Sequence, residues 1–350
     1  MINFGIIGCG WIAEKAYLPL IAKMDDISVN AIFDINYHKA HEIQDKYRVP
    51  NIFDNIDRFL SQSLDAVIIA TPNNTHTYYT NITLNSGKHV LCEKPVALSK
   101  NDIESTIALA HAKNKIYLPA FVNRFRKDIG RFSKLVALIG EIKEVEVNWV
   151  RKSGIPRPGT WITNKATAGG GVLIDIGTHV IDIGLSFLLD KRIQSVKLDQ
   201  GTVERAEQNG AQWNINNENR QQKFDVETWA KGELLFFNDS ILRFNVDWSS
   251  DINEDITSIK VVGNHGKTTI NTLFGFSNNF KRENIEILYD GTNGENKKVL
   301  YPMNNTFASD AFNDMVKYFI DAINGQAAGM LQPSDGVYVV DVIERLYKSV

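Results

Sequence analysis

The hydrophobic pattern of the first third of the chain alternates between short apolar runs and longer amphipathic stretches. The apolar runs lack polar alternation, which is typical of strands buried on both faces of a parallel sheet. The amphipathic stretches have the period of helices, so a parallel sheet covered by helices on both faces is predicted. Pro19 should kink or divide the first helix. The predicted strands contain residues 4–7, 29–33, 66–70, 89–91 and 116–118, and the predicted helices span 12–24, 38–47, 75–86 and 100–114.

After about residue 140 the pattern changes to strict alternation of polar and apolar positions, which predicts an antiparallel sheet with few helices. Asn238-Asp239 separates two such strands and is a hairpin signal. The polar stretch 204–223 is expected to be a long surface loop. The strands are expected to contain residues 142–147, 232–237, 241–246 and 258–262, and the helices to span 172–188, 310–323 and 335–348.

Length and composition fit two packed domains. The chain has 350 residues, of which 43% are hydrophobic, and domains average roughly 100–150 residues. We predict an α/β domain with a doubly wound parallel sheet over residues 1–122. Residues 123–350 are expected to form an α+β domain for substrate binding and oligomerisation, with a mostly antiparallel open sheet.

Charge and cysteine content exclude several classes of partner. Lys and Arg number 38 against 41 Asp and Glu, so no overall positive field exists to bind nucleic acid or an anionic membrane. The two cysteines are too few for a disulfide framework. No export signal is found, and the longest apolar tract, 171–189, contains Asp175, His179 and Asp182, so no membrane span is predicted. We expect a cytoplasmic protein.

A glycine-rich turn follows the first predicted strand and begins the first helix. Its sequence is Gly8-Cys9-Gly10-Trp11-Ile12-Ala13. Two glycines in this context allow a tight turn and the close approach of a pyrophosphate to the helix N-terminus. Asp34 lies at the end of the second strand, where a carboxylate can bind the hydroxyls of a ribose. These features predict a Rossmann dinucleotide-binding domain.

The residues around Asp34 favour NAD over NADP. A carboxylate repels the 2'-phosphate of NADP, and the following residues, Ile35-Asn36-Tyr37, include no Arg or Ser to bind it. His38 and Lys39 could still turn toward a phosphate, so NADP remains the less favoured alternative.

Two further polar segments lie at strand ends, where open parallel sheets bind their ligands. Thr71-Pro72-Asn73 with His76 follows the strand 66–70, and Glu93-Lys94-Pro95 follows the strand 89–91. Both segments are expected to face the nicotinamide half of the cofactor.

The predicted helix 172–188 is apolar except for one narrow stripe. At about 100° per residue, its polar residues fall on one face, which should meet a wet cleft or a set of partners because unpaired buried polar groups are unfavourable. Asp175 and His179 are four residues apart, so the carboxylate can orient the imidazole. The stripe consists of Asp175, Thr178, His179, Asp182 and Ser186.

A proline- and glycine-rich segment before this helix is expected to form a loop that shapes a substrate pocket. Trp161 could stack on a sugar ring or fill a gap in the core. Arg151, Lys152 and Arg157 could bind an anionic substituent or remain solvated.

Together, these motifs resemble the glucose-fructose oxidoreductase, inositol dehydrogenase and rhizopine-catabolism (Gfo/Idh/MocA) family. The resemblance covers the whole chain, including the segments 225–248 and 347–349, and is most specific at Glu93-Lys94-Pro95. It implies an NAD(P)-dependent dehydrogenase that acts on a secondary alcohol of a sugar, inositol or related polyol.

The resemblance also implies roles for single residues. His179 would exchange the proton of the substrate hydroxyl, Asp175 would orient the imidazole or the substrate, and Lys94 would bind the same oxygen and the nicotinamide ribose. The Lys94-Pro95 bond could be cis. Arg124 matches a position near the substrate.

Three other functions remain open: a metal enzyme using Asp175, His179 and Asp182, a non-catalytic NAD-binding sensor, and an NAD-using glycosidase of the same family. A homodimer or homotetramer is expected through an uncovered apolar face of the second sheet.

Overall fold

In the computed structural model, two compact units are described over residues 2–202, 223–277, 279, 281–292, 294–302 and 307–350. Unit 1 consists of Met1–Val122 and Ser309–Val340, and unit 2 of Asn123–Ala308 and Asp341–Val350.

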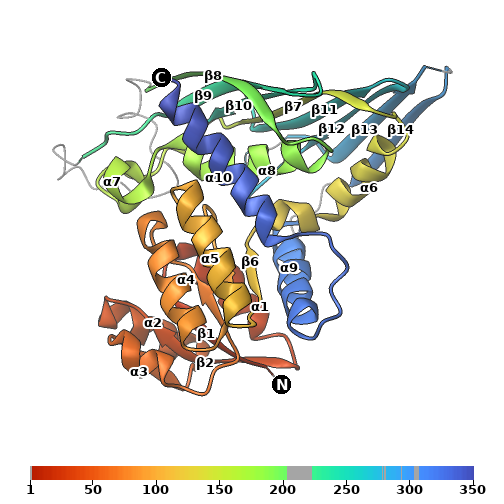
Figure 1. The fold of residues 1–350 in the computed structure, drawn as a ribbon. Helices are drawn as coiled ribbons and strands as arrows, with labels where there is room; N and C mark the ends of the chain where they lie inside the picture. Colours follow the sequence, from red (N-terminus) through yellow and green to blue (C-terminus); the bar gives the residue numbers. More distant parts are fainter. Residues whose placement is uncertain (1, 203–222, 278, 280, 293, 303–306) are drawn as a thin grey trace. The chain divides into compact units, whose positions relative to one another are not determined.

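Unit 1 is built on a six-stranded parallel sheet with the strand order β3-β2-β1-β4-β5-β6. This confirms the predicted doubly wound sheet. Figure 1 shows the ribbon of the chain, with β1, β2 and β6 of this sheet labelled. The strands are β1 (Ile2–Ile7), β2 (Ile27–Phe33), β3 (Asn51–Phe53), β4 (Ala66–Ile69), β5 (His89–Cys92) and β6 (Tyr117–Pro119). The helices are α2 (Tyr37–Tyr47), α3 (Ile56–Leu60), α4 (His76–Asn85) and α5 (Lys100–Ala112).

The two faces of this sheet are covered by different helices. On one face Gly5 leaves room for Phe59 of α3, since a Cβ at Gly5 would lie 2.6 Å from the Phe59 ring. On the other face Phe4 packs edge-on against Phe319 of α9 (Phe307–Ile323), with ring centroids 6.1 Å apart. Tyr17 packs against Phe312 of α9 in the same way, at 5.3 Å.

These contacts explain why the C-terminal region is divided between the units. The sequence assigned all of 123–350 to the second domain, whereas the structure groups Ser309–Val340 with unit 1. The apolar side of α9 and the first half of α10 (Pro333–Lys348) complete the unit 1 core, where Val340 joins Ile103 of α5.

The first predicted helix is divided, as its proline suggested. A π-helical turn, η1 (Ala13–Tyr17), precedes α1 (Leu18–Ile21), and Pro19 lies at the start of α1, where a missing N–H is tolerated. The wider π-turn places Tyr17 inside the core of unit 1.

Unit 2 is built on an eight-stranded sheet with the order β14-β13-β12-β11-β7-β10-β9-β8. All neighbouring strands are antiparallel except β7 and β10, which confirms the mostly antiparallel sheet. The sequence missed β8 and β12–β14 and the helix α6. The strands are β7 (Ile142–Val150), β8 (Ile193–Gly201), β9 (Trp229–Phe236), β10 (Ile241–Asp247), β11 (Ile256–Gly263), β12 (Gly266–Thr272), β13 (Asn284–Gly291) and β14 (Asn296–Pro302). The helices are α6 (Lys127–Val136), α7 (Lys165–Ala168) and α8 (Thr178–Ser186).

The predicted hairpin at Asn238-Asp239 joins β9 to β10. Asp239 has φ 62°, the left-handed conformation that a tight turn requires, and its N–H donates to the Phe236 carbonyl at 3.0 Å. The polar loop predicted at 204–223 lies, except for Lys223, outside the described residues.

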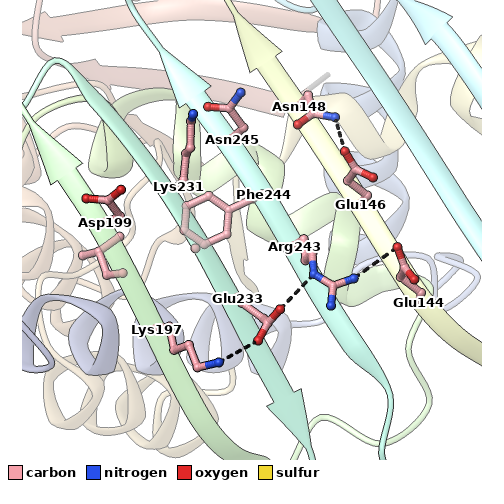
Figure 2. A pocket seen from close by; sticks show the side chains of 12 residues that line it. Glu144, Glu146, Asn148, Lys197, Asp199, Lys231, Glu233, Arg243, Phe244 and Asn245 are labelled. Carbon is pink, nitrogen blue, oxygen red and sulfur yellow. Dashed lines mark hydrogen bonds and ion pairs between the residues drawn. The ribbon is translucent and has the colours of Figure 1, made fainter.

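The two faces of the unit 2 sheet differ in polarity. Val145 and Val147 of β7 are fully buried, whereas Glu144 before them and Glu146 between them turn to the opposite face. On that face Arg243 bonds Glu233 at 2.8 Å and Glu144 at 3.2 Å, and Glu233 also bonds Lys197 (Figure 2). The sequence interpretation of an uncovered apolar face is therefore wrong, because alternation along β7 places charged side chains there.

Self-association through this charged face stays a prediction, now expected to depend on salt. Ion pairs between exposed side chains weaken as ionic strength rises, because salt screens them. Light scattering at micromolar concentration should return a multiple of the 39.4 kDa chain mass. A monomer at every salt concentration would contradict the prediction.

Among the residues that the structure describes, one helical stretch, Lys165–Ser186, is long and apolar enough to cross a membrane by length and composition alone. Its apolar window is 89% buried inside the protein. Packing of α8 against β7 and β10 accounts for this apolar character.

Candidate active site

The glycine-rich turn of unit 1 has the backbone geometry that its sequence suggests. Gly8 has φ 98°, and a Cβ there would lie 2.5 Å from the Ala70 carbonyl oxygen, so only glycine fits. Gly10 is different, since the nearest atom to a Cβ would be the same oxygen at 3.7 Å. The backbone at Gly10 is therefore open to a close ligand.

Asp34 is tied to this turn through its carboxylate. The Cys9 N–H donates to Oδ2 at 2.7 Å, and the Asn36 N–H donates to Oδ1 at 2.8 Å. The side chain remains partly exposed. Two backbone donors thus hold the carboxylate at the strand end, where it can still accept bonds from a ribose.

These residues fit a dinucleotide. The Gly8–Ala13 turn offers backbone without side-chain obstruction, and the Asp34 carboxylate is fixed beside it. Trp11 is 39% exposed next to the turn. The Cys9 thiol is buried, and burial raises its pKa to about 12, so this residue contributes its backbone N–H rather than a reactive thiolate.

The Thr71-Pro72-Asn73 segment continues into the 3-10 turn η2 (Asn73–Thr75) and α4. His76 is fully buried, with Nδ1 2.7 Å from the Pro95 oxygen and Nε2 2.8 Å from the Thr71 oxygen. Burial lowers the pKa of this imidazole. His76 therefore ties the two strand-end segments together, and a direct contact of its side chain with the cofactor stays a prediction.

The Glu93-Lys94-Pro95 segment follows β5 and contains a cis Lys94-Pro95 peptide bond. Glu93 is buried, and its carboxylate accepts a 2.7 Å bond from the Tyr17 hydroxyl and a 3.2 Å bond from the Lys94 N–H. Burial raises the pKa of the Glu93 carboxyl. These contacts assign Glu93 to holding the backbone of Lys94, and cofactor contact by the Glu93 side chain also stays a prediction.

The predicted polar helix of unit 2 starts with a π-helical turn, η5 (Leu173–Gly177), and continues as α8. All residues from 171 to 185 are described, and within them only Asp175 and His179 are partly exposed. The otherwise buried stretch 171–185 thus presents one carboxylate and one imidazole at its surface.

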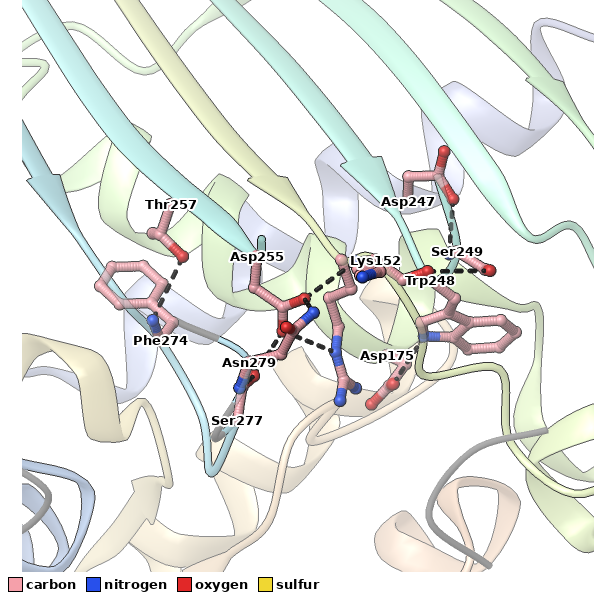
Figure 3. A network of polar contacts seen from close by, with 11 residues as sticks. Lys152, Asp175, Asp247, Trp248, Ser249, Asp255, Thr257, Phe274, Ser277 and Asn279 are labelled. Carbon is pink, nitrogen blue, oxygen red and sulfur yellow. Dashed lines mark hydrogen bonds and ion pairs between the residues drawn. The ribbon is translucent and has the colours of Figure 1, made fainter. Parts of the chain in front are cut away.

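Asp175 and His179 each contact a tryptophan of unit 2. The Trp248 indole N–H donates to Asp175 Oδ2 at 2.9 Å (Figure 3). The His179 ring lies 5.9 Å from the Trp149 indole, centroid to centroid, at 43°. Both tryptophans are buried, so they fix the positions of the two polar side chains.

The rest of the polar stripe is paired within unit 2. Arg124 bonds Asp182 through Nε at 3.0 Å and Nη2 at 2.6 Å, and both side chains are almost fully buried. The hydroxyls of Thr178 and Ser186 bond carbonyls of their own helix. Arg124 therefore neutralises Asp182 in this structure. A contact of Arg124 with the substrate stays a prediction.

The metal-enzyme alternative gains no support from this arrangement. Over the described part of the chain, no group of three or more His, Cys, Asp or Glu side chains could hold an ion. Asp182, one of the three proposed ligands, faces a guanidinium instead.

The predicted substrate loop is anchored at its start by Asp255, which is 2% exposed. Its carboxylate accepts bonds from the Lys152 N–H at 2.8 Å and from the side chains of Ser277 and Asn279 (Figure 3). Arg151 Nε lies 3.7 Å from the same carboxylate, which offsets its charge. Further along the loop, Arg157 and Trp161 are exposed.

Comparison with known families agrees with both units. The model of an oxidoreductase family with an NAD-binding Rossmann fold, Gfo/Idh/MocA, matches residues 2–121. The model of a C-terminal domain of the same family matches residues 136–269. The chain belongs to the Gfo/Idh/MocA oxidoreductase family. Its two matched regions lie one in each unit and include the glycine-rich turn, Lys94, Asp175 and His179.

Two curated relatives cover most of the chain. A protein of Amycolatopsis mediterranei, named as a candidate UDP-kanosamine synthase oxidoreductase subunit, is 29% identical over 83% of this chain and 81% of its own. The D-glucoside 3-dehydrogenase of Escherichia coli is 26% identical over 99% of this chain and 95% of its own.

A solved structure shows the same fold over the full length. It is a 3-ketoreductase from Actinomadura kijaniata, with a TM-score of 0.78 and 18% identity. The match covers 99% of this chain and 97% of that one.

Sequence reasoning missed one supporting residue in each unit: Tyr17, which binds Glu93, and Trp248, which binds Asp175. Tyr17 lies within the first helix and gave no signal beyond an apolar position. Trp248 lies 73 residues from the Asp175 carboxylate that it binds. A tryptophan two residues after the predicted strand 241–246, between the polar residues Asp247 and Ser249, was the available signal.

Proposed function

We propose that the protein is an NAD-dependent dehydrogenase that oxidises a secondary hydroxyl of a sugar, at C3 of a glucopyranoside. The observation that carries this proposal is the partial exposure of Asp175 and His179 within the otherwise buried stretch 171–185, in a chain whose other unit has the glycine-rich turn that fits a dinucleotide. A neutral imidazole is suited to accept a hydroxyl proton near neutral pH.

The residues divide the reaction between them. The Gly8–Ala13 turn and Asp34 would hold NAD, which would supply the hydride acceptor for the carbinol carbon. His179 takes the hydroxyl proton as the C–H bond breaks, so an alcohol and NAD⁺ give a ketone, NADH and one proton. Lys94 donates a hydrogen bond to the same oxygen and stabilises its developing negative charge. Asp175, held by Trp248, orients the imidazole or a neighbouring substrate hydroxyl.

The reacting carbon is proposed from the relatives. The E. coli relative that aligns over nearly the full chain is named as acting at position 3 of D-glucosides, and the solved relative is named a 3-ketoreductase. Oxidation at C3 leaves the glycosidic bond of a glucoside intact, so the expected product is a 3-ketoglucoside.

A substrate panel with NAD tests the proposal. Methyl β-D-glucopyranoside, UDP-glucose and scyllo-inositol are incubated with the protein while NADH absorbance is followed, and the carbon oxidised is assigned by NMR. A 3-keto sugar with equimolar NADH is expected. Methanol release without net NADH would indicate the glycosidase alternative, and no reaction with any compound would contradict a sugar dehydrogenase.

The preference for NAD is proposed to depend on Asp34. Replacing this residue by serine removes the charge that repels a 2'-phosphate and weakens the bonds to the adenosine ribose. A charged hydrogen bond contributes about 1.5–3 kcal/mol, so the Kd for NAD should rise about 10- to 100-fold while NADP binds no worse. Isothermal titration of both cofactors measures this.

Asp54 provides a matched control, because it is an exposed carboxylate next to the end of the neighbouring strand β3. Asp54→Ser should leave both affinities unchanged. Tighter binding of NADP than NAD by the wild-type protein would refute the cofactor assignment.

A further inference from the structure

Glu227, a residue with no role so far, lies at the start of the helix that carries Asp175 and His179. Its carboxylate accepts bonds from the Gly171 N–H at 3.0 Å to each oxygen and from the Leu173 N–H at 3.0 Å. Its backbone carbonyl accepts from the Val172 N–H at 3.0 Å. One residue thus satisfies three successive backbone donors at a helix start, where intrahelical acceptors are lacking.

A second residue holds this carboxylate from the C-terminal end of the chain. The Tyr347 hydroxyl of α10 donates to Glu227 Oε1 at 2.8 Å. Burial and the Glu227 carboxylate raise the pKa of Tyr347 well above its ordinary value, so the phenol stays protonated and remains a donor. The negative charge of Glu227 also lies at the positive end of the helix dipole, which favours it there.

The glycines before the helix make this contact possible. A Cβ at Gly170 would lie 1.9 Å from the Tyr347 hydroxyl, and a Cβ at Gly171 would lie 2.0 Å from the Glu227 carbonyl oxygen. Neither position accepts a side chain unless Tyr347 or Glu227 moves, and we call these two bonded residues the clamp.

Trp248, which binds Asp175, is joined through its backbone to the residue next to Glu227. The Trp248 N–H donates to the Thr228 carbonyl at 3.0 Å, next to Glu227, while the Trp248 indole binds Asp175. Residues just before β9 and just after β10 therefore hold the helix at two points, its first turn and the Asp175 carboxylate.

We propose that Glu227, held by Tyr347, is a positioning residue that fixes the start of the catalytic helix and thereby the placement of Asp175 and His179. The proposal rests on the proposed function for its catalytic meaning. Displacement of a reacting group by about 1 Å can cost about 100-fold in rate, so loss of this anchor should act on turnover.

The first test needs no substrate. In Glu227→Gln, an amide replaces one of the two acceptor oxygens, so hydrogen exchange of the amides in residues 171–179 should accelerate while that of β1 stays unchanged. Proton NMR of His179, assigned with a His179→Gln variant, should show a changed chemical shift, because the Trp149 ring lies 5.9 Å away. Unchanged exchange and an unchanged His179 signal would overturn the proposal.

The second test uses the sugar that wild-type protein oxidises. Glu227→Gln should lower kcat about 10- to 100-fold with the Kd for NAD unchanged, and the deuterium isotope effect at the reacting carbon should grow. A structural role alone would reduce the folded fraction and leave kcat per titrated site unaltered. Wild-type kcat in this variant would overturn the proposal, whereas inactivity of the wild-type protein on all sugars would refute only the proposed function.

Two further variants complete the series. Tyr347→Phe keeps the carboxylate and its backbone bonds, so it should fold and shift the same measurements in the same direction by less. Glu141→Gln is the matched control, since this exposed carboxylate of unit 2 pairs with Lys143 and Asn264 at the surface. It should change none of the measurements, and equal effects of Glu141→Gln and Glu227→Gln would also refute the clamp.

Discussion

Replacing Lys94 or His179 by alanine is expected to lower turnover about 10²- to 10⁴-fold, which is about 3–5 kcal/mol of activation free energy. In the proposed mechanism Lys94 would stabilise the oxygen that becomes negative and His179 would take its proton, so each loss should raise the barrier of the same step. Steady-state kinetics with the sugar identified in the panel measures both effects.

The pH dependence separates the two roles. His179 accepts a proton only as a neutral imidazole, so wild-type oxidation should rise with pH as the imidazole deprotonates. The His179→Ala variant should lack this rise, whereas Lys94→Ala should retain it at a lower rate.

One exposed histidine of α5 and the exposed lysine that follows the helix serve as controls for the loss of an imidazole or an ammonium group. His111→Ala and Lys113→Ala remove the same chemical groups from the surface of unit 1 and should leave turnover unchanged. A His179→Ala variant with full turnover would refute the assigned mechanism.

Replacing Asp182 by alanine is expected to destabilise the protein by about 3–5 kcal/mol. The substitution removes the carboxylate that bonds Arg124, whose side chain is only 8% exposed, and so leaves a guanidinium in a poorly hydrated place without this partner. The midpoint of urea unfolding, followed by circular dichroism, should fall accordingly.

A double replacement tests whether the pair itself is responsible. Arg124→Met combined with Asp182→Leu removes both charges at similar volume and should be less destabilising than Asp182→Ala alone. If Asp182 were a metal ligand, its replacement would instead change the metal content of the purified protein, and a stability loss below about 1 kcal/mol would contradict the buried ion pair.

Features formed by neighbouring residues could be derived from the sequence. The turn at Gly8 and Gly10 depends on backbone space within one strand-turn-helix unit, and Asp34 ends the next strand of the same unit. The order of strands and helices along the chain was sufficient to predict a parallel sheet. The alternation of polar and apolar residues along β7 also predicts a charged outer face of the second sheet, in contrast to the apolar face expected from the sequence.

The polar stripe of η5 and α8 was visible in the sequence as a pattern, but the partners of its residues were not. Asp175 binds Trp248, Asp182 binds Arg124, and the helix start binds Glu227, at separations of 73, 58 and 54–56 residues. A polar stripe of this kind is compatible with a metal site or with catalytic side chains. Only the partners that the folded chain gives to each carboxylate distinguish the two.

The sequence by itself determined the two kinds of sheet, the dinucleotide-binding turn and the polar face with Asp175 and His179, because these depend on residue period and local backbone space. Only the tertiary structure decided which carboxylates are neutralised, which residues hold the start of η5, and that most of α9 belongs to the first unit. Those outcomes depend on which distant surfaces exclude water together, and adjacency along the chain does not specify that.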